Sequence, residues 1–212
     1  AEYAGVPVWN GLTTEAHPTQ FIADALTIRE NFGDVRGLTV VFMGDAKNNV
    51  ANSLMVGCAK LGMNYVACCP DADAPDSELV EKCRTVAAEN NCTVTVTSDV
   101  EEGTKGAHVI YTDIWVSMGE PASLWEQRIK ELSPYQVNAK VMANAADNAI
   151  FMHCLPAFHD TKTTVAQEIE GKFGLTEMEV TDEVFEGPQS RVFDEAENRM
   201  HSIKAVVLAT LR

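Results

Sequence analysis

Residues 38–69, LTVVFMGDAKNNVANSLMVGCAKLGMNYVACC, decide the fold of this chain. The apolar run at 38–43 predicts a buried β-strand, and the Gly44-Asp45 pair after it predicts a tight turn. A helical pattern then runs from Val50 to Leu61 and stops at Gly62, before a second apolar strand at 65–69. Because strand, helix and strand in this order form a βαβ unit, we expect parallel strands covered on both faces.

The same alternation extends along the chain on both sides of this unit. Strands are expected at 93–97, 109–112 and 150–154, with one more at 1–10, and helices at 18–31, 77–89, 100–105, 122–132, 135–143 and 195–212. We therefore predict an α/β fold, a doubly wound, Rossmann-like parallel sheet with helices on both faces and a further helix at each end. The expected organisation is an inter-domain segment at 1–34, an α/β domain at 35–190 and a C-terminal inter-domain helix at 191–212.

The composition limits the classes of function. The net charge of −15 argues against nucleic acid as a partner, because phosphate binding requires clustered Lys and Arg; it is compatible with cationic small substrates. The six cysteines form no CxxC pair and are expected to be reduced thiols, not a disulfide framework. Neither a signal peptide nor a run of about 18 apolar residues occurs, so we expect a cytoplasmic protein without a membrane partner.

Polar clusters follow two of the predicted strands, where an open α/β sheet keeps its chemistry. After the strand at 38–43, Gly44 is a single glycine, so the dinucleotide fingerprint GxGxxG is absent. Asn48 and Asn49 fit either the cap of the next helix or amides that orient a zwitterion. After the fourth strand, Asp113 suits an ammonium group or belongs to a loop anchored by a buried Trp. A turn-like run follows it, Ser117-Met118-Gly119.

A Cys and two His residues lie at the end of the fifth predicted strand, in the run FMHCLPAFHD at 151–160. Cys154 suits a nucleophile, a metal ligand or a small buried side chain, and His153 and His159 are neighbours that lower a thiol pKa. Adjacent strand residues point to opposite faces, however, and no second Cys/His pair has ligand spacing. We therefore expect neither covalent catalysis nor a metal site.

The last polar cluster is divided between the first and the last predicted helix. His17 and Gln20 lie three residues apart at a helix N-terminus, where backbone N–H groups and an imidazole suit polarisation of a carbonyl. Arg199 lies on a mixed polar face of the last helix. Each of these helices, taken alone, also fits a solvated polar face.

Together these segments resemble the ornithine carbamoyltransferases. The resemblance rests on NGLT with HPTQ at 10–13 and 17–20, GD with NN at 44–45 and 48–49, D with SMG at 113 and 117–119, HCLP at 153–156 and ENRMH at 197–201. The motifs occur in the family's order, and SMG separates ornithine users from aspartate and putrescine relatives. The longer strings HCLPAFH and WVSMGEP look most like the catabolic enzymes of the arginine deiminase route.

The resemblance implies a reaction and an ornithine site. The family transfers a carbamoyl group from carbamoyl phosphate to L-ornithine, giving citrulline and phosphate, without a metal or an organic cofactor. The α-amino and α-carboxylate groups of ornithine would be held by Asn49, Asp113, Ser117 and Met118. Asp113 and the Cys154-Leu155 segment would face the δ-amine that attacks.

The resemblance also implies a second substrate site and a missing partner domain. His17 and Gln20 would hold the carbamoyl carbonyl, and Arg199 would share the charge of carbamoyl phosphate. The family's Ser-x-Arg-Thr-Arg phosphate loop, which belongs to an N-terminal carbamoyl-phosphate domain, does not occur in this sequence. We expect an ornithine-binding half, cut from a larger protein, that turns over negligibly alone and exposes apolar surface on its end helices. The full-length protein is expected to be a homotrimer or a multiple of trimers.

Two other functions fit the same sheet. One is a non-catalytic amino-acid-binding module of this fold. The other is a nucleotide-dependent oxidoreductase, although the missing GxGxxG and the missing ribose-binding acid count against it.

Overall fold

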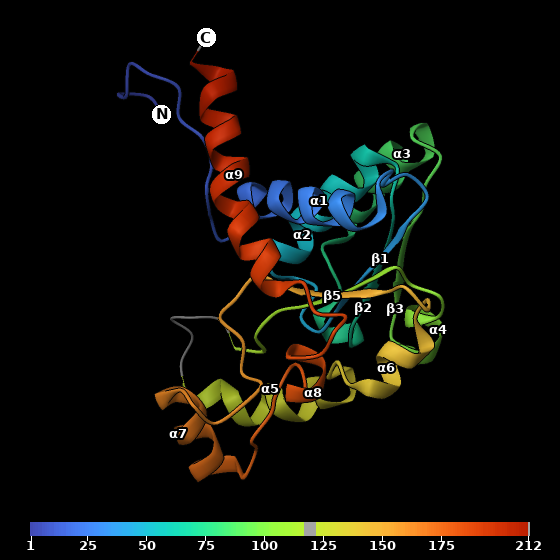
Figure 1. Ribbon diagram of the computed structural model, residues 1–212, viewed down its shortest axis with the longest axis vertical. Helices are drawn as coiled ribbons and strands as arrows, with labels where there is room; N and C mark the ends of the chain where they lie inside the picture. Colours follow the sequence, from blue (N-terminus) through green and yellow to red (C-terminus); the bar gives the residue numbers. More distant parts are fainter. Residues whose placement is uncertain (117–121, 212) are drawn as a thin grey trace.

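Five parallel strands form one sheet in the computed structural model, which describes residues 1–116 and 122–211 (Figure 1). The strands are β1 (Thr39–Met43), β2 (Asn64–Cys68), β3 (Val94–Thr97), β4 (Val109–Thr112) and β5 (Ile150–His153). Their order across the sheet is β3-β2-β1-β4-β5, and Val41 of β1 is level with Val66 of β2 and Ile110 of β4. The parallel sheet predicted from the sequence is therefore confirmed.

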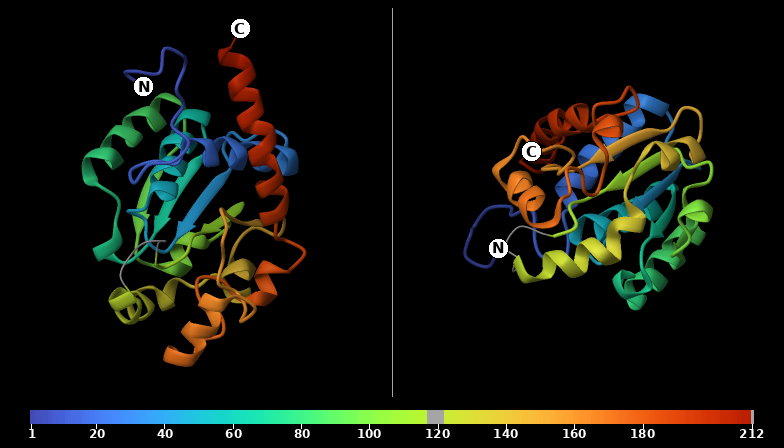
Figure 2. Two further views of the ribbon diagram at one scale, coloured as in Figure 1. Left: turned by 90° about the vertical axis from the view of Figure 1, so that its left-hand side faces the viewer. Right: turned by 90° about the horizontal axis from the view of Figure 1, so that it is seen from below.

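Helices cover both faces of the sheet (Figures 1 and 2). Successive strand residues point to opposite faces, so Phe42 packs into one core and Val41 and Phe151 into the other. These side chains are fully buried, and each contributes roughly 1.5–3 kcal/mol to stability. The first core contains α1 (Pro18–Phe32), α2 (Asn49–Leu61) and α3 (Ser77–Glu89), and the second contains α4 (Val100–Thr104), α6 (Ala139–Asn144) and α8 (Asp182–Phe185).

A long C-terminal helix, α9 (Val192–Thr210), packs across α1 (Figure 1). The contact is partly polar, since Asn198 Nδ2 donates to Thr27 Oγ1 at 3.0 Å and to Glu30 Oε2 at 2.7 Å. Beyond α1 the helix extends away from the sheet (Figure 2), and there Leu208 is 56% exposed. No helix within the described ranges combines the length and hydropathy that a membrane crossing requires.

The chain turns in opposite directions after the neighbouring strands β1 and β4. After β1 it passes through α2 to β2 on one side, and after β4 it passes over the other face to β5. A crevice forms where the carboxyl ends of two such strands meet. Gly44, directly after β1, has φ +119°, a conformation that favours glycine, and it brings this turn close to Thr112 at the end of β4.

Two predictions of secondary structure are wrong. Residues 1–10 form no strand, and this segment is irregular and exposed. The helix predicted at 135–143 begins only at Ala139. Residues 136–138 are extended because Val137 pairs with Val180, which lies much later in the chain. A local pattern of apolar residues does not reveal a pairing partner that is distant in sequence.

The structure also contains α7 (Thr164–Phe173), which the sequence analysis did not predict. Its start and stop signals are ordinary: Thr163 Oγ1 accepts a bond from the Ala166 N–H at 3.1 Å, and Gly174 ends the helix with φ +68°. The remaining helix is α5 (Trp125–Leu132), and short 3₁₀ turns occupy Asp71–Asp73, Ala122–Leu124 and Ser133–Tyr135.

Candidate active site

A cavity of about 250 Å³ lies at the carboxyl ends of β4 and β5, beside the N-terminal end of α1. It brings together six residues that the sequence predicted for the site: His17, Asn49, Asp113, Cys154, Leu155 and Arg199. Gln20 is buried behind the cavity, in contact with the Arg199 guanidinium. The other two predicted residues, Ser117 and Met118, lie outside the described residues. Segments that are far apart in the sequence therefore meet at one place.

Asp113 follows β4 directly and is held by groups on three sides. Its Oδ1 accepts bonds from the Ile114 N–H at 2.8 Å and the Cys154 thiol at 3.3 Å, and its Oδ2 accepts one from Asn48 Nδ2 at 3.2 Å. Burial raises the pKa of Asp113 above its usual value, against the opposing effect of His153. The carboxylate is thus fixed in direction and is a stronger proton acceptor than an exposed aspartate.

Asn48, and not Asn49, is the residue that orients Asp113. Asn48 accepts the Ala51 N–H through Oδ1 at 2.8 Å, capping α2, and this leaves its amide N–H groups for Asp113. Asn49 lines the cavity, but its Nδ2 donates to the Thr13 carbonyl at 2.7 Å. The capping role considered for the asparagine pair is therefore confirmed for Asn48, which also has a second role that the sequence did not indicate.

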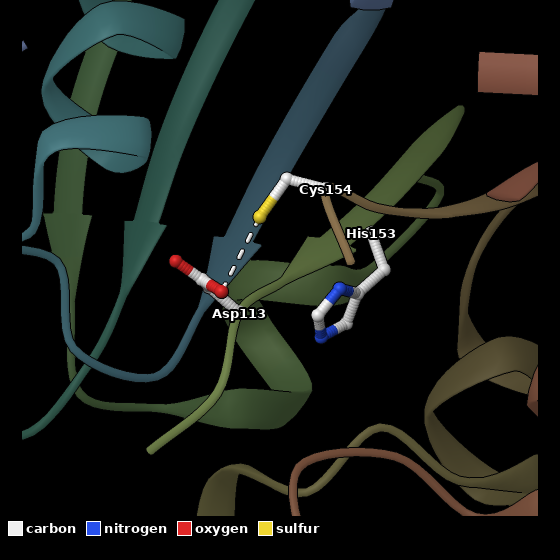
Figure 3. Close-up of side chains that lie close together, drawn as sticks. All are labelled: Asp113, His153 and Cys154. Atoms are coloured by element: carbon white, nitrogen blue, oxygen red, sulfur yellow. Dashed lines mark hydrogen bonds between the residues drawn. The ribbon is translucent and has the colours of Figure 1, made fainter. Parts of the chain in front are cut away.

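The Cys154 thiol points toward Asp113 and donates to it, and the His153 ring lies near both side chains (Figure 3). Burial, followed by the negative charges of Asp113 and Glu195, raises the pKa of Cys154 well above that of an ordinary thiol. A thiol in this environment stays protonated near neutral pH and is a poor nucleophile. His159 does not activate it, because its Nδ1 lies 2.7 Å from Asp182 Oδ1 and its ring stacks on Phe185.

The side chains of Asp113, His153 and Cys154 come close enough to hold a metal ion, with their ligand atoms all within 4.8 Å of one another. Neither ring nitrogen of His153, however, has a lone pair free for a metal ion at this place. Nδ1 accepts the Leu155 N–H at 2.9 Å, and Nε2 is 3.4 Å from Glu179 Oε1. Together with the protonated thiol, this arrangement fits a hydrogen-bonded wall better than a metal centre.

The loop after β5 is held by the buried pair of His153 and Glu179. Leu155 has φ +59°, the following Leu155-Pro156 peptide bond is cis, and the Leu155 N–H donates to His153. Glu179 Oε1 accepts the Phe158 N–H at 2.6 Å farther along the loop. Burial lowers the pKa of His153, and the carboxylates of Glu179, Asp113 and Glu195 together raise it above its usual value. A proton on Nδ1 would nevertheless displace the Leu155 N–H. The pair therefore positions the loop that forms one edge of the cavity.

On the opposite side of the cavity, His17 and Arg199 lie together. His17 Nδ1 is 2.8 Å from the Gly11 carbonyl, so it carries the ring proton, and the unprotonated Nε2 lies 3.4 Å from Arg199 Nη1. Burial, followed by the charge of Arg199, lowers the pKa of His17. The imidazole is therefore neutral near pH 7, and Arg199 supplies the positive charge of this side.

Behind these two residues, Gln20 has a fixed orientation. Its Nε2 donates to Asp24 Oδ1 and to Glu195 Oε1, both at 2.8 Å, and its Oε1 accepts a bond from Arg199 Nη1. The sequence analysis did not single out Asp24 or Glu195 for the site. Glu195 looks like an ordinary acidic residue in the first turn of α9, and Asp24 like one polar residue of α1.

Comparisons with known proteins agree with this arrangement. The family described as "Aspartate/ornithine carbamoyltransferase, Asp/Orn binding domain" matches residues 36–210. The carbamoyl-P binding domain of the same family matches residues 1–30. The N-terminal segment and most of α1 therefore resemble the end of a different domain from the one that contains the sheet.

Individual relatives lead to the same family. The catabolic ornithine carbamoyltransferase of Treponema denticola is 64% identical over 211 residues, which is 100% of this chain and 62% of that protein. The ornithine carbamoyltransferase of Staphylococcus aureus strain Newman is 54% identical over 213 residues, covering 100% of this chain and 64% of that protein. The crystal structure of the ornithine carbamoyltransferase from Gloeobacter violaceus has a TM-score of 0.84 at 41% identity and covers 100% of this chain and 64% of that one. This chain spans less than two thirds of the length of these relatives. As its motifs predicted, the chain belongs to the aspartate/ornithine carbamoyltransferase family and is similar to ornithine-specific members along its whole length.

Proposed function

We propose that this chain is the ornithine-binding part of an ornithine carbamoyltransferase, which converts carbamoyl phosphate and L-ornithine to citrulline and phosphate, and back. The observation that carries this proposal is the division of one cavity into two walls. The acidic wall contains Asp113 with Cys154, and the cationic wall contains Arg199 with His17. Ornithine brings amino groups and carbamoyl phosphate brings anionic oxygens, so each wall attracts one substrate.

The acidic wall suits the amine that attacks. In the reaction the δ-nitrogen of ornithine bonds to the carbonyl carbon, the bond from that carbon to the phosphate oxygen breaks with its electron pair on oxygen, and the nitrogen loses a proton. Asp113, held by Asn48 and the Ile114 N–H, accepts an N–H of the amine and keeps its lone pair directed at the carbon. The raised pKa of Asp113 favours acceptance of the proton. Cys154 stays a neutral thiol that packs beside the amine, and no covalent enzyme intermediate is needed.

The cationic wall suits the group that is transferred. Arg199 Nε is buried and has no hydrogen-bond partner among the described residues, so it is available to an oxygen of the ligand. A guanidinium in a partly enclosed site stabilises the negative charge that develops on the carbonyl and phosphate oxygens. Gln20 acts through Arg199, since both of its N–H groups are already donated to Asp24 and Glu195. Asn49, Leu155 and the predicted Ser117 and Met118 complete the ornithine side.

The proposal includes the setting of the enzyme. We assign it to arginine breakdown by the arginine deiminase route in the cytoplasm, because the relative from T. denticola is named as catabolic. We also propose that a carbamoyl-phosphate domain covers the cationic wall and that the complete protein forms trimers or multiples of trimers. The family match at residues 1–30 and the exposed apolar side chains of α9 support a covering domain. A net charge of −15 fits small-molecule substrates, with neither nucleic acid nor a membrane as partner.

A two-part assay tests the function. The 212-residue chain is titrated with ornithine and with NAD while its thermal unfolding is followed, and citrulline is then measured before and after addition of a separately made carbamoyl-phosphate domain from the T. denticola enzyme. We expect ornithine but not NAD to stabilise the chain, and citrulline to form only in the mixture. Stabilisation by ornithine without citrulline in the mixture would favour a non-catalytic amino-acid-binding module. Stabilisation by NAD alone would favour an oxidoreductase.

A further inference from the structure

Two acidic side chains are buried together beneath the cationic wall. Asp24 of α1 is 0% exposed and Glu195 of α9 is 1% exposed, and they lie where α1 packs on α9, beside Tyr111 of β4. Buried carboxyl groups are costly unless they are hydrogen-bonded, so their contacts show what keeps them there. Neither residue lines the cavity itself.

Glu195 links three elements that surround the cavity. Its Oε1 accepts bonds from Gln20 Nε2 of α1 and from the Tyr111 hydroxyl of β4, each at 2.8 Å. Its Oε2 accepts the backbone N–H of His153, at the end of β5, at 3.0 Å. The next residue after His153 is Cys154 of the acidic wall. One carboxylate therefore connects the group behind Arg199 with the strand that carries Cys154.

Asp24 and Glu195 lie close together, because both contact the Gln20 amide and the Tyr111 hydroxyl. Two buried carboxylates this close repel each other, which favours a proton on one of them. Burial raises the pKa of Glu195, and the bonds that it accepts from Tyr111 and the His153 N–H oppose that rise. Burial, followed by the negative charge of Glu195, raises the pKa of Asp24 well above its usual value. Asp24 Oδ2 is also buried without a hydrogen-bond donor among the described residues, so Asp24 is the partner that favours the proton.

This pair determines which end of the Gln20 amide faces the cavity. Asp24 and Glu195 each accept one N–H of Gln20, so both of its donors are used on the buried side. Only the amide oxygen remains, and it receives the Arg199 guanidinium. A rotated amide would direct its N–H groups at a cation and its oxygen at two carboxyl groups, and it would lose all of these bonds.

We propose that Glu195, with Asp24 beside it, is a positioning residue that fixes the Gln20 amide and thereby holds Arg199 toward the substrate. The expected effect on catalysis rests on the proposed function, whereas the orientation of the Gln20 amide does not. The proposal predicts unequal roles for the two acids. Glu195 must be an anion that accepts several bonds, whereas Asp24 must be the neutral group of the pair.

Two substitutions that preserve shape test this asymmetry. Asp24→Asn replaces a carboxylic acid by an amide, which still accepts the Gln20 N–H and carries no charge beside Glu195. Glu195→Gln replaces an acceptor oxygen by an NH₂ group that faces existing donors, so at least one of Gln20, Tyr111 and the His153 N–H loses its partner. Thr27→Val is the matched control, because it removes the Asn198 bond from the same helix interface without touching the pair.

The first measurement is the side-chain amide resonance of Gln20 in the 212-residue chain, assigned by its loss in Gln20→Glu. We expect its two amide protons to keep their hydrogen-bonded shifts in Asp24→Asn and in Thr27→Val, and to move toward those of a solvated amide in Glu195→Gln. Unchanged shifts in Glu195→Gln, or equal changes in both acid variants, would overturn the proposal. Since this measurement needs no turnover, it decides the geometry even if the chain proves not to belong to a carbamoyltransferase.

The second measurement is citrulline formation after addition of the carbamoyl-phosphate domain. We expect kcat to fall roughly 100-fold in Glu195→Gln, with KM for ornithine changed by less than about threefold, because the loss of bonds to a buried anion acts through Arg199. Asp24→Asn and Thr27→Val should both stay within about threefold of wild type. If Glu195→Gln fails to fold, Tyr111→Phe removes a single donor and should lower kcat by roughly threefold to tenfold. Wild-type kcat in Tyr111→Phe, or equal losses in the two acid variants, would refute the positioning role.

Discussion

The two walls of the cavity are built in different ways. Asp113 of the acidic wall is held by groups at the ends of neighbouring strands, Asn48 after β1 and Cys154 after β5. The cationic wall depends instead on the packing of α1 against α9, since Arg199 contacts Gln20 across 179 positions of sequence. The acidic wall is thus a product of the sheet edge, whereas the cationic wall is a product of two helices and the buried acids beneath them. Substitutions on one wall should therefore leave the other intact.

Asp113→Asn should have the largest effect, because it removes the proton acceptor of the acidic wall while keeping its shape. We expect citrulline formation in the two-part assay to fall roughly 1000-fold, and ornithine to stop stabilising the chain. Asp34→Asn, at an exposed carboxylate paired with Arg36, serves as the control and should behave as wild type. Normal ornithine binding by Asp113→Asn would show that ornithine does not use this wall.

Arg199→Met should break the cationic wall and spare the acidic one. We expect turnover to fall roughly 100-fold, since a half-buried guanidinium no longer stabilises the developing charge. Ornithine affinity of the chain, measured by calorimetry, should change by less than about twofold. Lys204→Met, an exposed cation on the same helix, is the matched control. A loss of ornithine affinity in Arg199→Met as large as that in Asp113→Asn would contradict the division into two walls.

The proton beneath the cationic wall should be visible in the pH dependence of stability. Because the folded-state pKa of Asp24 lies above the usual value of 3.8, the stability that this proton provides is complete below about pH 3.8 and is lost as the pH rises toward the folded-state pKa. Wild type should therefore lose up to about 1.4 kcal/mol per pH unit more than Asp24→Asn in that range. Urea unfolding of both proteins at a series of pH values measures the difference, and parallel curves would show that Asp24 is ionised. The other titratable or charged groups that face Asp24 are Glu195, Tyr111 and Arg199. They are present in both proteins, so their own titration does not account for a difference between the two curves.

Cys154→Ser should have the smallest effect on the acidic wall. A serine hydroxyl still donates to Asp113 and is close in size to the thiol, so citrulline formation should fall by only about threefold. Cys83→Ser, at a buried thiol of α3 that does not line the cavity, controls for the general cost of the substitution. A loss as large as that of Asp113→Asn would instead indicate that the sulfur takes part in covalent chemistry.

The fold was predictable because its signals are local. The boundaries of α3 and β4 agree with those predicted, and those of α1 and β1 differ by one residue at one end. The predicted strand at 1–10 is wrong, because a strand-like pattern of apolar residues forms a strand only where another strand pairs with it. The extended residues around Val137 were missed for the opposite reason, since their partner Val180 is distant in sequence.

The sequence singled out residues that line the cavity but not the buried acids that lie behind it. His17, Asp113 and Arg199 stand out as polar residues at strand or helix ends, where chemistry is expected. Asn48 was indistinguishable from Asn49, because helix geometry alone decides which of two adjacent amides faces β4. Glu195 and Glu179 look like surface acids, and their burial arises only when segments distant in sequence meet.

The packing of α9 across α1 also has a consequence for the order in which the protein is made. During translation the sheet and Asp113 leave the ribosome well before Arg199, which must reach Gln20, 179 positions earlier in the sequence. Until then the Gln20 amide lacks its bond to Glu195 and has no fixed direction. A nascent chain can therefore complete its acidic wall while its cationic wall does not yet exist, and α9, which is synthesised after the sheet, makes the two walls one site.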